Sequence, residues 1–233
     1  MIDHNEIDRI KEVYESRSIP DLKERGYLWH PCSPVSVYYR QAQERAVISL
    51  VNKYLLQLET IHLLDVGCGT GNYLRFMLSL GAAPEHLYGI DLIPLRIQHA
   101  RKISPSGMNL HVGNATALPF PNQSLDVLSQ FTVFSSILDH PVRLKIAEEM
   151  MRVLKPGGFL IWYDLRRGQS PTVKGLAEHE VRTLFKPCEL LELRFIHPPY
   201  ATRLARRSIF LCEVLERIPG LKSTHCMALF KKI

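Results

Sequence analysis

Short apolar runs alternate with segments of helical period through the first two thirds of the chain. Between residues 37 and 58, apolar side chains recur at the three- and four-residue spacing of one helix face, which predicts a helix. The same pattern predicts strands at 61–66, 86–90, 108–112, 125–131 and 159–163, and helices at 71–80, 94–102 and 139–154. Strands that alternate with helices form a parallel sheet covered on both faces, so we expect an α/β fold.

The last third of the chain has a different pattern. A strand-like run at 190–196 is followed by a basic amphipathic helix at about 201–218 and by a closing strand at 223–231. This order predicts an antiparallel pair of strands at one edge of the sheet. The apolar stripe of the helix (Leu204, Leu211, Leu215 and Ile218) is interpreted as packing rather than membrane binding.

Size and composition agree with one globular domain over residues 1–233, with an N-terminal cap segment at 1–40 and a substrate-facing insertion at 165–220. A hydrophobic fraction of 46% and a charged fraction of 22% are ordinary for such a domain. The five cysteines include no CxxC pair, which indicates free thiols and no metal site. The N-terminus is charged and no apolar run approaches the roughly 20 residues that span a bilayer, so we expect a cytoplasmic protein.

The formal net charge of +6 lies in the C-terminal part of the chain. Residues 1–164 carry 16 Lys and Arg against 17 Asp and Glu, whereas residues 165–233 carry 13 against 6. A basic excess attracts an anionic substrate, a nucleic acid or a membrane surface, or serves solubility alone. Charge by itself does not choose among these partners.

Three glycines follow the first predicted strand within five residues, in Asp65-Val66-Gly67-Cys68-Gly69-Thr70-Gly71. The dinucleotide fingerprint G-x-G-x-x-G has its third glycine one residue later, and the Gly-Lys-Ser/Thr of a P-loop is missing. A pyrophosphate binds to bare N–H donors at a helix start, and the carboxylate of Asp65 would repel it. The turn therefore favours a ligand that carries positive charge.

Two further polar positions follow the next strands. Asp91 ends the second strand, twenty residues after Gly71, where a carboxylate can accept hydrogen bonds from both hydroxyls of a ribose. Asn114 and Ala115 come after the third strand and precede Leu118-Pro119-Phe120, so they offer polar contacts and an apolar wall to an adenine edge. The fourth strand runs through Gln130 into a loop beneath the same ligand.

Together these four motifs resemble those of the class I S-adenosylmethionine-dependent methyltransferases, in their small-molecule, methyltransferase type 11-like branch with a VGCGTG turn. The resemblance covers about residues 37–164, with the motifs in the family's order and spacing. It implies S-adenosylmethionine as the cofactor. It also implies a Rossmann-like, seven-stranded, mostly parallel sheet with helices on both faces and an antiparallel last strand inserted beside its neighbour.

The resemblance also implies roles for single residues around the cofactor. Asp65 and the backbone of Gly67, Cys68 and Gly69 would hold the methionine moiety, and Tyr39 or Arg40 would reach its carboxylate. Asp91 would bind the ribose diol, and Leu92 would pack on the adenine. Asn114, where many relatives have Asp, and the N–H of Ala115 would meet the adenine edge, and Gln130 would close the pocket under the sulfonium.

The acceptor is expected to be a small molecule, aromatic or anionic, methylated at oxygen or nitrogen. The aromatic residues that favour this expectation are Tyr27, Trp29, Phe131, Phe134 and Tyr200. The catalytic base stays unassigned among His30, Asp139, His140, Asp164, His197 and Tyr200. Two alternatives remain: an RNA or protein methyltransferase that docks through its basic C-terminal third, and a scaffold that binds the cofactor without turnover. The oligomeric state is open.

Overall fold

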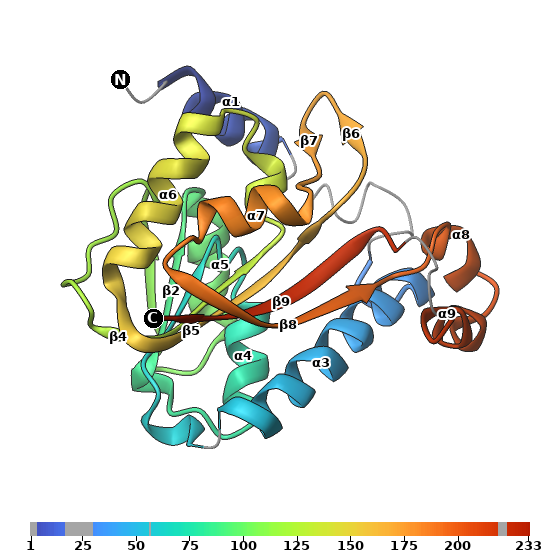
Figure 1. Ribbon diagram of the computed structural model, residues 1–233, viewed down its shortest axis with the longest axis horizontal. Helices are drawn as coiled ribbons and strands as arrows, with labels where there is room; N and C mark the ends of the chain where they lie inside the picture. Colours follow the sequence, from blue (N-terminus) through green and yellow to red (C-terminus); the bar gives the residue numbers. More distant parts are fainter. Residues whose placement is uncertain (1–3, 17–29, 56, 219–222) are drawn as a thin grey trace.

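A seven-stranded sheet forms the centre of the protein in a computed structural model that describes residues 4–16, 30–55, 57–218 and 223–233 (Figure 1). The strand order is β3-β2-β1-β4-β5-β9-β8. The strands are β1 (Leu63–Val66), β2 (Leu87–Asp91), β3 (Asn109–Val112), β4 (Leu125–Phe131), β5 (Leu154–Leu165), β8 (Cys188–Ile196) and β9 (His225–Lys232). Because β9 pairs antiparallel with both β5 and β8, it is the inserted antiparallel strand, and the expected fold is confirmed.

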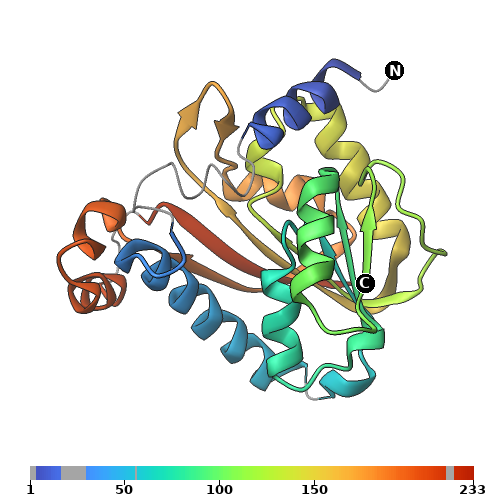
Figure 2. The same ribbon diagram turned by 180° about the vertical axis from the view of Figure 1, so that it is seen from behind.

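Helices cover both faces of this sheet, as Figures 1 and 2 show from opposite sides. One face carries α3 (Pro34–Tyr54), α4 (Asn72–Ser79) and α5 (Pro94–Ile103); the other carries α6 (His140–Val153) and α7 (Glu178–Leu184). The remaining elements are α1 (His4–Glu15), α8 (Ala201–Ala205), α9 (Ile209–Glu216), the short helices η2 (Leu58–Thr60), η3 (Pro84–His86) and η4 (Phe134–Ser136), and a hairpin of β6 (Gln169–Ser170) and β7 (Val173–Lys174).

The strand β5 contains a continuous apolar run because its successive side chains point to opposite faces of the sheet and both faces are covered. Leu160 and Trp162 belong to the hydrophobic core beneath α6 and α7, whereas Ile161 and Tyr163 belong to the core beneath α3 and α4. Because both faces of the sheet are covered, every one of these side chains is buried. The sheet is therefore a rigid platform for the loops at its edge.

The C-terminal third differs from the sequence expectation in two ways. The single helix expected at 201–218 is two helices, because the chain breaks after α8 and Ser208 begins α9 by accepting the N–H of Leu211 at 3.2 Å. Within the expected insertion at 165–220, the helix α7 was not expected and packs into the core beside α6, whereas β8 at the edge of the sheet confirms the strand expected at 190–196. In the described residues, no helix is both long enough and apolar enough to cross a membrane.

Candidate functional site

Two adjoining cavities lie where the parallel strands β1, β2 and β4 end, the edge at which open α/β sheets bind ligands. They share the lining residues Gly67, Arg96, Phe131 and Thr132, so one elongated ligand can occupy both. The first cavity, of about 150 Å³, is bounded by the ends of β2 and β3 and by α1; the second, of about 350 Å³, is bounded by the glycine-rich turn and α3.

The glycine-rich turn is held against β2 by its own backbone. The N–H groups of Gly67 and Cys68 both donate to the carbonyl of Ile90, at 2.8 and 3.0 Å. Gly67 has a φ of +71°, and a Cβ atom there would lie 2.4 Å from Cγ2 of Val133. Glycine is required at this position because both the conformation and the space exclude a side chain.

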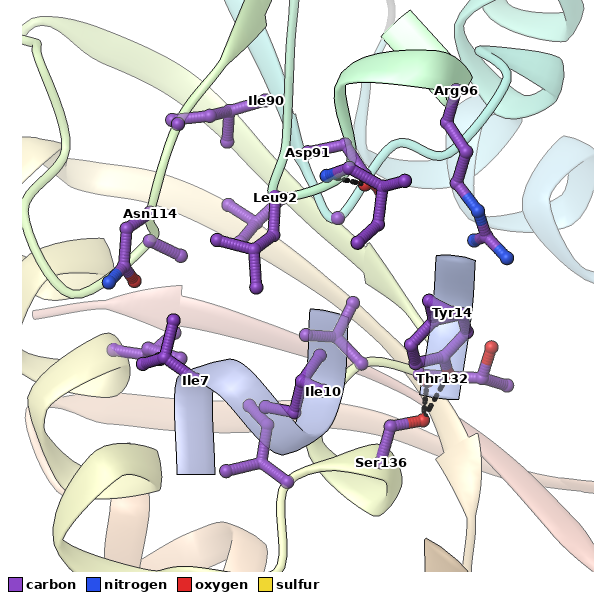
Figure 3. A pocket seen from close by; sticks show the side chains of 18 of the residues that line it. Ile7, Ile10, Tyr14, Ile90, Asp91, Leu92, Arg96, Asn114, Thr132 and Ser136 are labelled. Atoms are coloured by element: carbon purple, nitrogen blue, oxygen red, sulfur yellow. Dashed lines mark hydrogen bonds between the residues drawn. The ribbon is translucent and has the colours of Figure 1, made fainter. Parts of the chain in front are cut away.

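Asp91 joins this turn to the start of α5. Its carboxylate is 7% exposed and accepts hydrogen bonds from the N–H groups of Gly69, at 2.8 Å, and Ile93, at 2.9 Å. Burial raises the pKa of Asp91, while these bonds and the nearby charge of Arg96 act in the opposite direction. Each carboxylate oxygen has two lone pairs, so Asp91 retains acceptor capacity toward the first cavity, which it lines (Figure 3).

Asp65 is the buried carboxylate of the second cavity. It is 2% exposed, and the Ser129 hydroxyl donates to it at 2.7 Å. Burial, with a smaller contribution from the charge of Asp91, raises the pKa of Asp65 to about 7, although the Ser129 bond lowers it. No Lys, Arg or His of the described residues forms an ion pair with it. A cationic ligand would supply the missing countercharge.

The other expected cofactor residues separate into two groups. Leu92, Asn114 and Ala115 line the first cavity, and Cys68, Gly69 and Arg40 line the second. Tyr39 lines neither, because its ring stacks on His197 at a centroid distance of 4.0 Å. Of the two alternatives for the methionine carboxylate, the structure therefore brings Arg40 to the cavity.

Gln130 also lies outside the lining of both cavities. It is fully buried; its amide nitrogen donates to the carbonyl of Tyr163 at 3.2 Å, and its amide oxygen accepts the N–H of Val133 at 3.0 Å. These bonds fix the start of the loop after β4. Gln130 thus acts on the cavities by positioning Phe131, Thr132 and Val133, which do line them.

Helix α1, which lies within the cap segment expected at 1–40, forms the roof of the first cavity, but none of its residues was expected in the site. Ile7, Ile10 and Tyr14 face Asp91 and Leu92 across the cavity (Figure 3). The three- and four-residue spacing of these apolar side chains is the signal that would have indicated an amphipathic helix here.

Three side chains of α1 bind the roof to η4 and to the residues that follow it. Glu6 is 7% exposed and accepts the N–H of Leu138 at 2.5 Å; it also accepts two bonds from Arg9, at 2.6 and 2.8 Å. Arg9 donates in turn to the carbonyl of Ser136 at 2.7 Å. The hydroxyls of Tyr14 and Ser136 lie 2.5 Å apart. The roof is therefore held by polar contacts at a buried site.

Most of the candidates for the catalytic base and most of the aromatic residues expected around an acceptor lie outside the lining of the two cavities. None of His30, Asp139, His140, Asp164, His197 and Tyr200 lines either cavity. Of the aromatic residues expected around an acceptor, Phe131 lines both cavities, Phe134 packs on Trp162 in the core and Tyr200 is 78% exposed. Tyr27 and Trp29 lie outside the described residues. Among the described residues, no group of three or more potential ligands is arranged to hold a metal ion.

Comparison with known proteins agrees with this geometry. Residues 64–162, which contain the turn and its partner strands, match the family described as "Methyltransferase domain". A crystal structure of an S-adenosylmethionine-dependent methyltransferase from Methanosarcina mazei shares the fold, with a TM-score of 0.58 and 20% identity over 79% of this chain and 97% of that one. The chain thus contains a methyltransferase domain, and its fold is that of the class I S-adenosylmethionine-dependent enzymes.

Two curated relatives of the methyltransferase are named demethylmenaquinone methyltransferase. The Bacillus licheniformis protein is 29% identical over 174 residues, which cover 72% of this chain and 68% of the relative. The Listeria welshimeri protein is 31% identical over 115 residues, so this chain spans only about half (47%) of that relative's length.

The cofactor is S-adenosylmethionine, which is a sulfonium cation. Two features of the site fit this ligand: the buried carboxylate of Asp65, which has no ion-pair partner among the described residues, and the turn at Gly67, where there is no room for a side chain.

Proposed function

We propose that this methyltransferase transfers the methyl group of S-adenosylmethionine to an oxygen or nitrogen atom of a small, ring-bearing, apolar acceptor. The observation that carries the proposal is the apolar wall beside the shared part of the two cavities. Ile7 and Ile10 of α1 line the first cavity together with Val133 and Ile137 of the segment after β4, and Phe131 lines both cavities. The printed names of the curated relatives, which refer to a quinone, support an acceptor of this kind.

The cofactor would lie across both cavities in this proposal. Asp65 and the backbone of the turn would hold the methionine part, with Arg40 at its carboxylate. Asp91 would bind the ribose hydroxyls, and Leu92 and Asn114 would line the adenine. The side-chain oxygen of Asn114 already accepts the N–H of Thr116 at 3.0 Å, so its NH₂ group and a second lone pair remain for the ligand.

Thr132 would position the acceptor, since it lines both cavities. Its φ of +58° is unusual for a β-branched residue, and such strained conformations occur preferentially at functional sites. The conformation is held because its N–H donates to the carbonyl of Tyr163 at 2.8 Å and its hydroxyl donates to the carbonyl of Phe131 at 2.7 Å.

The chemistry would rely on alignment and desolvation. The bound cofactor supplies an electrophilic methyl group, and the protein holds an acceptor in line with it. Such alignment is worth up to about 7–11 kcal/mol of the barrier. None of the six base candidates lines either cavity, and Asp65 and Asp91 are assigned to the cofactor, so we propose an acceptor that is nucleophilic before it binds, or that loses its proton to solvent.

A transfer assay tests the proposed function. The protein is incubated with methyl-labelled S-adenosylmethionine and a panel of hydroxylated and amino-substituted aromatic compounds, including demethylated quinols, and label in the organic extract is counted. We expect label in at least one ring-bearing acceptor. Label that enters only RNA or protein of a cell extract, or no acceptor at all, would contradict the proposal.

Cofactor affinity should depend on pH through Asp65. In the free protein its pKa is about 7, so below pH 7 the carboxyl is protonated and must lose its proton to pair with the ammonium of the cofactor. We expect the affinity for S-adenosylmethionine, measured by calorimetry, to rise between pH 5.5 and 7.5. The slope should approach about tenfold per pH unit at the acidic end.

Two variants make this pH experiment specific. Asp65→Asn should bind weakly and without this slope, because its side chain does not titrate. Asp126→Asn, at the opposite end of the sheet beside Lys155, should keep the slope. Wild-type affinity that is flat across this pH range would remove Asp65 from the cofactor site.

A further inference from the structure

Residues 201–218, which contain α8 and α9, form an arm at one end of α3, on the side away from α6 and α7 (Figures 1 and 2). Four large apolar side chains of this arm are exposed: Phe210 (73%), Leu211 (42%), Val214 (41%) and Ile218 (47%). The expectation that Leu211 and Ile218 serve internal packing is therefore wrong. The buried side chains of this arm are Ala201, Ala205 and Cys212.

Phe210, Leu211 and Val214 share one face of α9, because their positions follow the helical period, and Ile218 comes two residues after the helix ends. The opposite face of α9 is fixed to α3. Arg45 lies 3.0 Å from the Glu213 carboxylate and 3.8 Å from that of Glu216, which also accepts a hydrogen bond from the Tyr38 hydroxyl. The rigid contact to α3 thus presents the apolar face outward.

The charge on the outer side of the arm is positive. Arg203, Arg206, Arg207 and Arg217 are exposed, and none of them forms an ion pair with another described residue. Both acidic residues of the arm are instead engaged by Arg45. The arm thus carries four exposed arginines without an ion pair in addition to its four exposed apolar side chains.

The charge of the arm is complementary to an anionic surface, because its four arginines form no ion pair with another described residue and both of its acidic residues are engaged by Arg45. An interfacial helix likewise combines apolar side chains with Lys and Arg that meet anionic headgroups. We propose that the arm docks on anionic lipid bilayers, with Phe210, Leu211, Val214 and Ile218 at the acyl boundary and the arginines among the headgroups.

Docking would bring the cofactor site to the bilayer, because α3 connects the two. The helix that anchors the arm through Tyr38 and Arg45 also places Arg40, Gln43 and Glu44 in the lining of the second cavity. This proposal goes beyond the proposed function and does not depend on it. Binding to vesicles needs neither cofactor nor acceptor, so a failed transfer assay leaves it intact.

Co-sedimentation with vesicles tests the docking surface. The whole chain is mixed with phosphatidylcholine vesicles that contain or lack about a third of phosphatidylglycerol, at low and at physiological salt. We expect binding to the anionic vesicles, at least about tenfold weaker binding to the neutral ones, and a decrease with salt. Failure of the wild-type chain to bind anionic vesicles even at low salt would overturn the proposal.

Surface variants locate the binding on the arm. Arg206→Glu with Arg207→Glu should weaken anionic binding at least about tenfold, and Phe210→Ser with Val214→Ser should weaken it at either salt concentration. The matched control is Lys102→Glu with Ile103→Ser on α5, where Ile103 is 47% exposed; it should bind as the wild type does.

Two measurements decide between docking on lipid and other uses of the arm. Circular dichroism and S-adenosylmethionine affinity should be unchanged in the arm variants, which shows that the fold and the cofactor site are intact. Light scattering should give the same mass for the wild type and for the Phe210 and Val214 variant. A wild-type dimer that this variant dissociates, or arm variants that bind vesicles as tightly as the wild type, would contradict the proposal.

Discussion

Replacing Asp91 with alanine should weaken S-adenosylmethionine binding by at least about 100-fold. Hydrogen bonds to a charged group contribute roughly 1.5–3 kcal/mol each, and the proposed role of Asp91 gives the ribose two of them. The same change removes the acceptor that holds the N–H groups of Gly69 and Ile93, so the turn also loses its preformed geometry. Calorimetric titration of the purified variant measures the loss directly.

Two controls separate the carboxylate from a general loss of structure. Asp91→Asn keeps one acceptor oxygen without the charge, and its affinity should lie between those of the wild type and the alanine variant. Glu85→Ala removes an exposed acidic side chain from the short helix before β2 and should leave affinity unchanged. Equal affinities of the wild type and Asp91→Ala would mean that the ribose lies elsewhere.

The polar residues that line the two cavities beside the turn could be predicted from sequence because local signals determine their positions. Asp65, Asp91 and Asn114 each follow a short apolar run, and the carboxyl ends of neighbouring parallel strands meet at one edge. The structure brings Asp65 and Asp91 close enough for their charges to interact, and each lines a cavity beside the turn. No long-range information was needed beyond the order of the strands.

The roof over the first cavity could not be predicted in the same way. Its position depends on Glu6 reaching the backbone of Leu138, across more than half of the chain, and neither residue type indicates such a partner. The side chain of Gln130 poses a similar problem. A polar residue at the end of a strand can face a ligand or brace its own loop, and only the bonds to Tyr163 and Val133 show which occurs.

The outer face of α9 shows a different limit of sequence patterns. A helical stripe of apolar residues indicates that one face avoids water, but the stripe does not say what covers it. Leu211 and Ile218 belong to such a stripe and are nevertheless exposed, because α3 contacts the face that carries Cys212 and the acidic residues. Burial depends on where the neighbouring helix lies, which the local pattern leaves open.

Gly67→Ala should be the most damaging single-methyl change in the glycine-rich turn. A Cβ at this position adds the strain of a left-handed conformation, about 1–2 kcal/mol, to an overlap with Val133 at 2.4 Å, for which overpacking costs about 1–3 kcal/mol. We expect the free energy of unfolding to fall by roughly 2–5 kcal/mol in urea denaturation. S-adenosylmethionine affinity should fall with it, because the turn must shift away from the loop after β4.

Gly157→Ala is the matched control, since Gly157 has a φ of +76° and no atom within 4 Å of its added Cβ. It should lose only the conformational part, about 1–2 kcal/mol, and bind the cofactor normally. Gly67→Ala with Val133→Ala removes the overlapping Cγ2 atom, and the nearest Val133 atom left is the Cβ at 3.6 Å. This double variant should recover the free energy of unfolding that Gly67→Ala loses to overpacking, but it should keep the loss that comes from the left-handed conformation. Equal losses for Gly67→Ala and Gly157→Ala would show that the turn moves freely against the loop, which its bonds to Ile90 argue against.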